Sequence, residues 1–140
     1  MKRQHVYLAG SIEGVSEHEM TAWRNYVTQQ LDMADINTLD PTRRGILHER
    51  FDDSNIRNRI VQQDLEDISR SKVVFADLRD STPGKKWGTV MEVSLAQRDR
   101  RIIIALVDEY QFKHPFIWSM ATEVHTDIDD AIAATISYYE

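Results

Sequence analysis

Glu92 is the residue of this chain best suited by type and position to act as a nucleophile. The segment Gly88-Thr89-Val90-Met91-Glu92 follows a strand-like run and places this carboxylate in the first turn of a predicted helix. A helix N-terminus favours an ionised carboxylate, and a partly desolvated carboxylate can attack an electrophilic sugar carbon. The spacing Thr89-x-x-Glu92 equally fits a capping box, in which the glutamate only satisfies a backbone amide. Both interpretations remain open.

A second carboxylate, Asp64, falls on the apolar side of another predicted helix. At about 100° per residue it lies within the apolar stripe, whereas Glu66 and Asp67 fall outside it. A carboxylate facing a core costs several kcal/mol unless it is paired or hydrogen-bonded. Asp64 is therefore either a structural residue that caps a loop or pairs with an arginine, or a functional acid. The stripe consists of Ile56, Ile60, Val61, Leu65 and Ile68.

Other polar candidates follow or lie in predicted strands. Asp77 ends an apolar strand and is either a ligand-binding residue or one that structures the following loop. Tyr7 is either a core residue or a phenol that hydrogen-bonds a carboxylate. Gly10 and Ser11 begin a loop that leaves room for a ligand near the backbone. Arg43 is a candidate for holding a phosphate, although exposed loop arginines are more often only solvated.

Several kinds of site lack support in the sequence. The chain has no cysteine, which excludes disulfides, thiolate metal sites and a cysteine nucleophile. The histidines show no HExxH or other paired spacing, so we expect no metal site. GxGxxG, P-loop and GxSxG patterns are absent, and we expect no cofactor. A net charge of -6 without a long basic block argues against binding a nucleic-acid polymer.

The length of 140 residues predicts one domain over residues 1–140. No apolar run approaches the roughly 20 residues that a membrane span needs, so we expect no membrane partner. The basic start Met1-Lys2-Arg3 is not followed by a long apolar segment, which argues against a secretory signal. We therefore expect a cytoplasmic protein.

Strand and helix patterns alternate along the chain, which predicts an α/β fold with a doubly wound parallel sheet and helices on both faces. We expect five strands in the order 2-1-3-4-5, so that the switch point lies between the first and third strands and ligands bind beyond their carboxyl ends. Loops are expected at 10–14, at 42–53, at 79–86 and around His114-Pro115. The strands are expected at 5–9, 36–39, 72–78, 101–107 and 121–125, and the helices at 16–33, 54–70, 88–98 and from 126 onward.

Four segments in order resemble the nucleoside 2-deoxyribosyltransferase family and the related 2'-deoxynucleoside 5'-monophosphate N-glycosidases. The resemblance covers about residues 5 to 107. Asp40-Pro41-x-Arg43 and His114-Pro115-Phe116 further resemble small, often phage-borne members. The four segments are Val6-Tyr7-Leu8-Ala9-Gly10-Ser11-Ile12, Asp64-Leu65-x-x-Ile68, Val73-Val74-Phe75-Ala76-Asp77-Leu78 and Gly88-Thr89-x-x-Glu92.

The resemblance implies a flavodoxin-like fold and a role for each matching residue. Glu92 matches the nucleophile that attacks the anomeric carbon and forms a glycosyl-enzyme intermediate. Asp64 matches an acidic residue near the base or the nucleophile, and Tyr7 matches the tyrosine that orients the nucleophile. The substrate pocket would be lined by Gly10, Ser11, Asp77, Lys86, Trp87, Gly88 and Thr89, with Arg43 as a further candidate.

The resemblance also implies partners. Substrates would be a 2'-deoxynucleoside or deoxynucleotide and a free nucleobase, used in nucleotide salvage by a homodimer or larger homo-oligomer. One departure concerns Lys86, which stands where classical transferases carry an aspartate that contacts the base. A lysine there would favour a phosphate. The residues leave open transfer of the sugar to another base, hydrolysis of a monophosphate, and binding of a nucleotide without catalysis.

Overall fold

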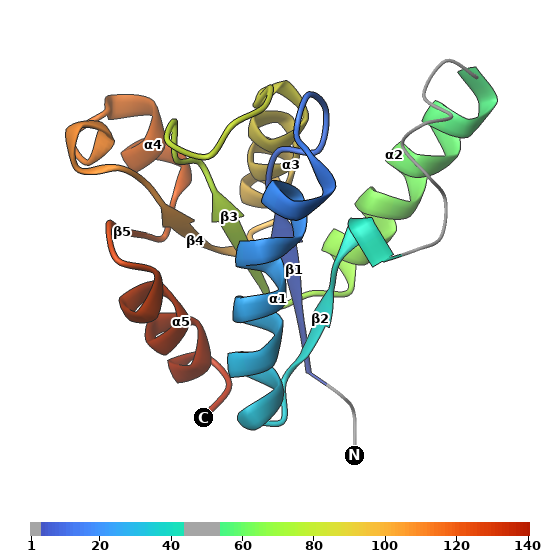
Figure 1. Ribbon diagram of the computed structural model, residues 1–140. Helices are drawn as coiled ribbons and strands as arrows, with labels where there is room; N and C mark the ends of the chain where they lie inside the picture. The colour runs from blue at the N-terminus through green and yellow to red at the C-terminus, as the bar shows by residue number, and fades with distance from the viewer. Residues whose placement is uncertain (1–3, 44–53) are drawn as a thin grey trace.

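Five parallel strands form the centre of the molecule, with helices packed on both faces (Figure 1). The computed structural model describes residues 4–43 and 54–140. The strands are β1 (His5–Ala9), β2 (Asn37–Leu39), β3 (Val73–Asp77), β4 (Ile102–Leu106) and β5 (Glu123–His125). The helices are α1 (Glu17–Met33), α2 (Ser54–Ser69), α3 (Trp87–Arg98), α4 (Pro115–Met120) and α5 (Ile128–Ser137), with 3-10 turns η1 (Pro41–Arg43) and η3 (Glu109–Gln111).

The strand order is β2-β1-β3-β4-β5, as predicted from the alternation of strands and helices. The chain changes direction across the sheet between β1 and β3, where Tyr7 pairs with Val74 and Ala9 with Ala76. In such sheets the loops that leave these two strands diverge and open a crevice at their carboxyl ends. The topology therefore places the loops after β1 and β3 at one edge of the sheet.

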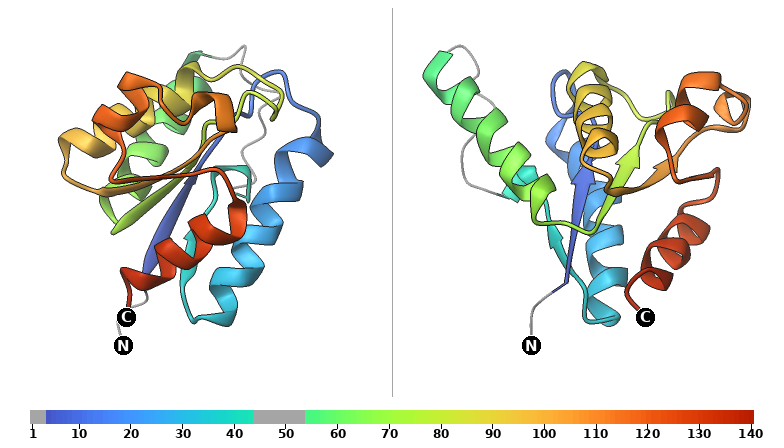
Figure 2. Two further views of the ribbon diagram at one scale, coloured as in Figure 1. Left: turned by 90° about the vertical axis from the view of Figure 1, so that its left-hand side faces the viewer. Right: turned by 180° about the vertical axis from the view of Figure 1, so that it is seen from behind.

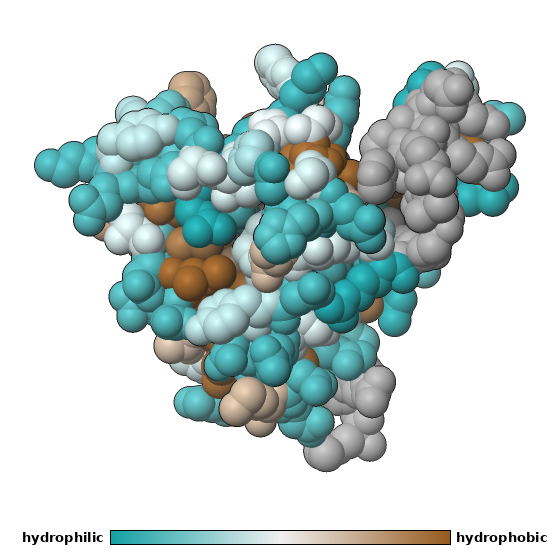
Figure 3. Space-filling view, in the orientation of Figure 1, coloured by the Kyte–Doolittle hydropathy of each residue, from teal (hydrophilic) through white to brown (hydrophobic). Residues whose placement is uncertain are grey.

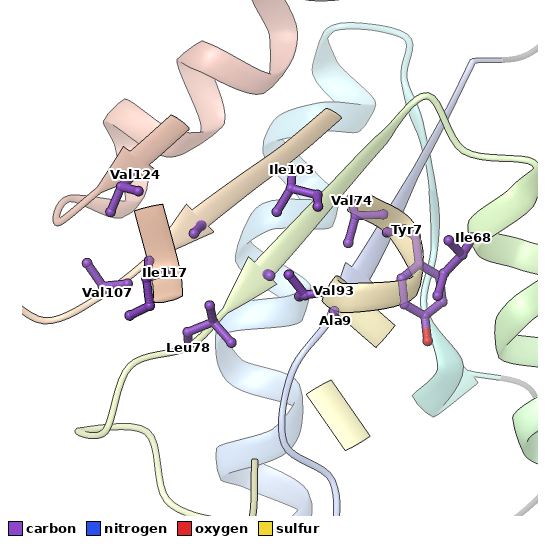
Figure 4. Close-up of a cluster of buried hydrophobic side chains, with 13 residues drawn as sticks. Tyr7, Ala9, Ile68, Val74, Leu78, Val93, Ile103, Val107, Ile117 and Val124 are labelled. Atoms are coloured by element: carbon purple, nitrogen blue, oxygen red, sulfur yellow. The ribbon is translucent and has the colours of Figure 1, made fainter. Parts of the chain in front are cut away.

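Alternation along the central strands produces two apolar layers, one on each face of the sheet. Figure 2 shows the helices that cover these faces. Val6 and Leu8 point toward α1 and α5, whereas Tyr7 and Ala9 point toward α2, α3 and α4. Figure 4 shows the second layer, with Tyr7 beside Ile68 of α2. A phenol is thus fully buried in an otherwise apolar cluster, and its hydroxyl needs a partner there.

Helix α2 departs from its predicted pattern. Val61 is 52% exposed although it lies in the predicted stripe, whereas Asp67, predicted outside it, is buried. The N-terminal part of α2 extends away from the sheet (Figures 1 and 2), so only its C-terminal turns pack on the core. Helical periodicity assumes one continuous contact face, and the divergence of α2 from the sheet removes that condition.

Helix α3 begins at Trp87, one residue before the predicted start, because Val90 N–H donates to Lys86 C=O and closes the first turn. The predicted loop around His114-Pro115 was wrong, since this segment contains η3 and the short helix α4. Proline at the first position of α4 lacks the N–H that a helix start leaves unpaired. The other predicted strands and helices are confirmed, with ends that differ by one or two residues.

The face shown in Figure 3 is mostly hydrophilic, with a hydrophobic area between α1 and α5. Within the described residues, no helix is long and apolar enough to cross a membrane. The predicted loop over residues 42–53 begins with the end of η1, and its residues 44–53 lie outside the described part of the chain.

Candidate active site

The carboxylate of Glu92 lies against the end of β1. Tyr7 OH, fully buried in the central strand, donates a hydrogen bond to Glu92 Oε2. Because α3 starts at Trp87, Glu92 lies in its second turn and Thr89 is a buried helical residue rather than an N-cap. The capping-box interpretation of Thr89-x-x-Glu92 is therefore wrong: the side chain of Glu92 points to a phenol across the helix–sheet interface.

The environment of Glu92 opposes its negative charge. Burial, charge repulsion from Asp64 and a side-chain hydrogen bond with Asp64 raise the pKa of Glu92 to about 8. The Tyr7 hydrogen bond and the positive charge of Arg24 act in the opposite direction and lower this pKa. Two carboxyl groups that interact in this way cannot both ionise without a cost. The pair is therefore set to hold one proton at neutral pH.

Three elements distant in sequence thus meet at one point. Tyr7 comes from β1, Asp64 from α2 and Glu92 from α3. Asp64 is partly buried and reaches Glu92 from the C-terminal half of α2, which packs against α3. The placement supports the functional alternative for Asp64, since its carboxyl interacts with another acid. Carboxyl groups whose pKa is shifted by burial and by a neighbouring charge are found mainly at functional sites.

Lys86 links the loops after β1 and β3. Its Nζ donates to Ser11 Oγ at 3.1 Å and to Thr82 C=O at 2.7 Å, so that both acceptors are uncharged. Ser11 is buried and Lys86 is partly buried, at the N-terminus of α3. A cation beside a hydroxyl and a helix N-terminus is suited to an anionic group of a ligand.

The motif glycines differ in their surroundings. A Cβ at Gly10 would lie 2.4 Å from Trp23 Cζ2, so this glycine is required by the close approach of α1 to the end of β1. A Cβ at Gly88 would have no neighbour within 4 Å. The neighbouring Trp87 is 79% exposed, which leaves its ring accessible to a ligand or to another chain. The start of α3 therefore borders open space.

Two predicted site residues have structural partners. Asp77 is buried and accepts hydrogen bonds from the backbone and guanidinium of Arg79 and from Thr82 Oγ1. These contacts favour the loop-structuring interpretation of Asp77. Arg43, half-exposed in η1, donates to Asn25 Oδ1 at 2.7 Å and lies 3.6 Å from Asp40 Oδ2.

Sequence reasoning missed the ion pair between Arg24 and Asp40. The atoms Arg24 Nη1 and Asp40 Oδ1 are 3.0 Å apart, and the two side chains are 0% and 1% exposed. Arg24 lies one residue after buried Trp23 and three before buried Val27, so an arginine on the buried side of an amphipathic helix was the available signal.

The site brings together the Glu92 carboxyl, a phenol that donates a hydrogen bond to it and a second carboxyl that interacts with it. No cluster of three or more histidine, aspartate or glutamate side chains suited to a metal occurs among the residues that the structure describes. Such an arrangement is suited to attack on an electrophilic carbon together with protonation of the leaving group.

Comparison with known proteins identifies the family of the chain. The model of a family described as nucleoside 2-deoxyribosyltransferase like matches residues 3–110. A search of curated protein sequences gave no significant match. A 2-deoxyribosyltransferase of Bacillus psychrosaccharolyticus is similar in structure with a TM-score of 0.74 and 18% identity, covering 94% of this chain and 95% of that chain.

Two other solved structures have related folds and different activities. The CMP N-glycosidase of Clostridium botulinum has a TM-score of 0.62 and 11% identity, covering 96% of this chain and 99% of that chain. The molybdenum cofactor carrier protein of Chlamydomonas reinhardtii has a TM-score of 0.65 and 16% identity, covering 99% of both chains. At these identities the likeness shows a shared fold, which hosts more than one function.

Proposed function

The chain belongs to the nucleoside 2-deoxyribosyltransferase like family, and from this membership we propose that it cleaves the N-glycosidic bond of 2'-deoxynucleosides and passes the sugar to another base. The observation that carries the proposal is the hydrogen bond from Tyr7 OH to Glu92 Oε2, with Asp64 coupled to the same carboxyl. A glutamate held in this way is oriented as a nucleophile.

The reactive form has Glu92 ionised. A carboxylate oxygen of Glu92 attacks C1' of the deoxyribose, a bond from oxygen to C1' forms, and the bond from C1' to the base nitrogen breaks. The electron pair of the broken bond goes to the base, which takes a proton from Asp64 or water. A nitrogen of the second base then attacks C1', the bond from C1' to the Glu92 oxygen breaks and frees the carboxylate, and the proton of that nitrogen passes to Asp64 or water.

A second candidate function, which one structural observation favours, is hydrolysis of a 2'-deoxynucleoside 5'-monophosphate. The supporting observation is Lys86, whose described partners, Ser11 Oγ and Thr82 C=O, are uncharged. A monophosphate would supply the anion that this cation and the neighbouring hydroxyl accept. Transfer and hydrolysis share the first half-reaction, and they differ in whether a base or water accepts the sugar. A binding protein without catalysis, on the fold of the molybdenum cofactor carrier, is the third possibility.

A chromatographic assay separates these functions. Purified protein is incubated with deoxyinosine plus free cytosine, and in parallel with deoxynucleoside monophosphates without an acceptor base. New deoxycytidine establishes transfer, whereas free base released mainly from monophosphates establishes hydrolysis. Absence of cleavage across a panel of bases, in a correctly folded protein, would refute both and favour the carrier.

The matched variant for this assay is Glu92→Gln, which keeps the size of the side chain and removes the nucleophile. We expect at least a 1,000-fold loss of turnover, as for removal of other nucleophiles, with an unchanged circular dichroism spectrum. Ser94→Ala, an exposed change on the same helix, is the control and should retain activity. Full activity of Glu92→Gln would contradict the double-displacement mechanism.

A homodimer is the assembly that we propose. Trp87, Met91 and Leu95 follow one another at intervals of four residues on α3 and are 79%, 62% and 39% exposed. An apolar stripe along the full helix is typical of a surface covered by another chain. Sedimentation analysis of the protein and of Met91→Glu tests this. We expect a dimer that the charged variant dissociates, and a monomeric parent protein would refute the proposal.

A further inference from the structure

A buried ion pair joins α1 to the residue after β2, next to the proposed active site. Arg24 Nη1 and Asp40 Oδ1 are 3.0 Å apart and excluded from solvent. Removing two charges from water is costly, and a buried pair often contributes little net stability. The position of Arg24 and Asp40 therefore suggests a role beyond packing.

Arg24 fixes the end of the strand that carries Tyr7. Its Nη1 donates to Leu8 C=O and its Nη2 to Gly10 C=O, each at 3.0 Å. These carbonyls lie on either side of the last residue of β1, where the chain leaves the sheet. Arg24 reaches them from α1, whereas the ring of Tyr7 packs on the opposite face. The guanidinium thereby holds the end of β1 from the face of the sheet that α1 and α5 cover, opposite α2 and α3.

Asp40 holds Arg24 and partly neutralises it. Its Oδ1 also accepts from Thr42 N at 2.9 Å and from Thr42 Oγ1 at 2.8 Å. Both contacts survive if the carboxylate becomes an amide of the same shape with its oxygen in place. Asp40→Asn therefore removes one negative charge and retains the geometry of an acceptor, which separates charge from packing.

The groups that shift the charge equilibrium of Glu92 come from three other elements: one hydrogen-bond donor and two charged side chains. Tyr7 of β1 donates a hydrogen bond, Asp64 of α2 repels the carboxylate, and Arg24 of α1 attracts it. Arg24 lowers the pKa of Glu92, and Asp64 and burial raise it. The cation is thus the charged group among them that favours the reactive form of the nucleophile.

We propose that Arg24 and Asp40 form a positioning pair for the reaction: Arg24 fixes the end of β1 beneath Tyr7 and stabilises ionised Glu92, and Asp40 limits how much positive charge Glu92 experiences. The inference rests on the proposed function, because it assigns the role of nucleophile to Glu92. Neither member of the pair is placed in contact with the reacting atoms.

The test is titration of the Glu92 carboxyl by NMR in protein labelled with 13C at the glutamate side chains, with Glu92→Gln to assign the signal. We expect Arg24→Gln to raise the midpoint by about half a pH unit or more, and Asp40→Asn to lower it by a similar amount. Arg24→Lys, which keeps the charge, should titrate as the parent does. Arg43→Gln is the matched control, since it removes a cation near Asp40 that carries no hydrogen bond to β1.

Shifts of opposite sign support the inference, because general loosening of the site would move both variants in the same direction. Shifts of the same sign, or midpoints unchanged from the parent, would overturn it. Where Arg24→Gln does not fold, Asp40→Asn compared with Arg43→Gln still decides, because an unchanged midpoint in Asp40→Asn contradicts the inference. The titration needs no turnover, so an inactive protein with the expected shifts refutes the proposed function and leaves the pair intact. An active protein whose titration midpoints do not move in the variants refutes the role of the pair and leaves the proposed function intact.

Discussion

Replacing Asp64 by asparagine should make the protein active at lower pH. Asp64 raises the pKa of Glu92 through charge repulsion and a side-chain hydrogen bond. Asparagine removes the charge, keeps a similar shape and offers an N–H donor that favours the ionised glutamate. The acid limb of kcat/KM against pH, which reports the free enzyme, should therefore move toward lower pH.

The size of this effect follows from the closeness of the two carboxyls. Two unit charges about 4 Å apart interact by about 4 kcal/mol at the effective dielectric of a protein surface. That energy corresponds to about 3 pH units, and both residues are partly open to solvent, so we expect a shift of about 1 to 2 pH units. With a pKa of about 8 in the parent, about a tenth of Glu92 is ionised at pH 7, and about half to nine-tenths of it would be ionised in Asp64→Asn.

The assay is cleavage of deoxyinosine from pH 5 to 9, for the parent, Asp64→Asn and Glu66→Gln. Glu66 is exposed on the same helix, and its variant is the control for loss of one charge from α2. At high pH Asp64 is ionised in the parent and gives no proton to the base, so the plateau of Asp64→Asn should stay close to that of the parent. A lower plateau with an unmoved acid limb would show that Asp64 acts only as a proton donor and would refute the electrostatic argument.

Three further predictions concern Tyr7, Gly10 and Glu92. Tyr7→Phe should lower kcat/KM by about 10- to 100-fold. It should also move the acid limb to higher pH, because it removes a hydrogen bond that stabilises ionised Glu92. An unmoved acid limb in steady-state kinetics would count against this role. Gly10→Ala should reduce the free energy of unfolding by about 1 to 3 kcal/mol in urea, because its Cβ would meet Trp23, whereas the control Gly88→Ala should not be destabilised. Native Glu92 binds its proton more tightly than the unfolded chain does, so the stability that this group contributes is present below about pH 4.5 and lost as pH rises through about 8. Glu92→Gln should therefore be more stable than the parent by about 1 to 3 kcal/mol at pH 8.5, and by a smaller amount at pH 5. Equal increases in stability at the two pH values, measured by thermal unfolding, would contradict the raised pKa.

Local pattern predicted the architecture because each signal was carried by contiguous residues. The apolar runs that became β3 and β4 are buried on both faces, as a central parallel strand requires, and alternation with helices leaves few topologies to consider. Helix α4 was missed because it is too short for periodicity, although Pro115 marked its start. The proposed Thr89 cap lies three residues beyond the observed cap, Lys86, which makes no side-chain capping hydrogen bond and therefore leaves little trace in the sequence.

The sequence by itself determined which residue types were available: a glutamate, an aspartate and a tyrosine in segments that resemble one enzyme family. Only the tertiary structure decided their partners. The hydrogen bond from Tyr7 to Glu92 joins residues 85 positions apart, and the repulsion between Glu92 and Asp64 depends on how α2 leans on α3. The pairing of Arg24 with Asp40 was not predicted, because it depends on contacts made only in the folded chain. There Arg24 is excluded from solvent and binds the Asp40 carboxylate and the Leu8 carbonyl. Periodicity is a property of neighbours in the chain, whereas a pKa is set by neighbours in space.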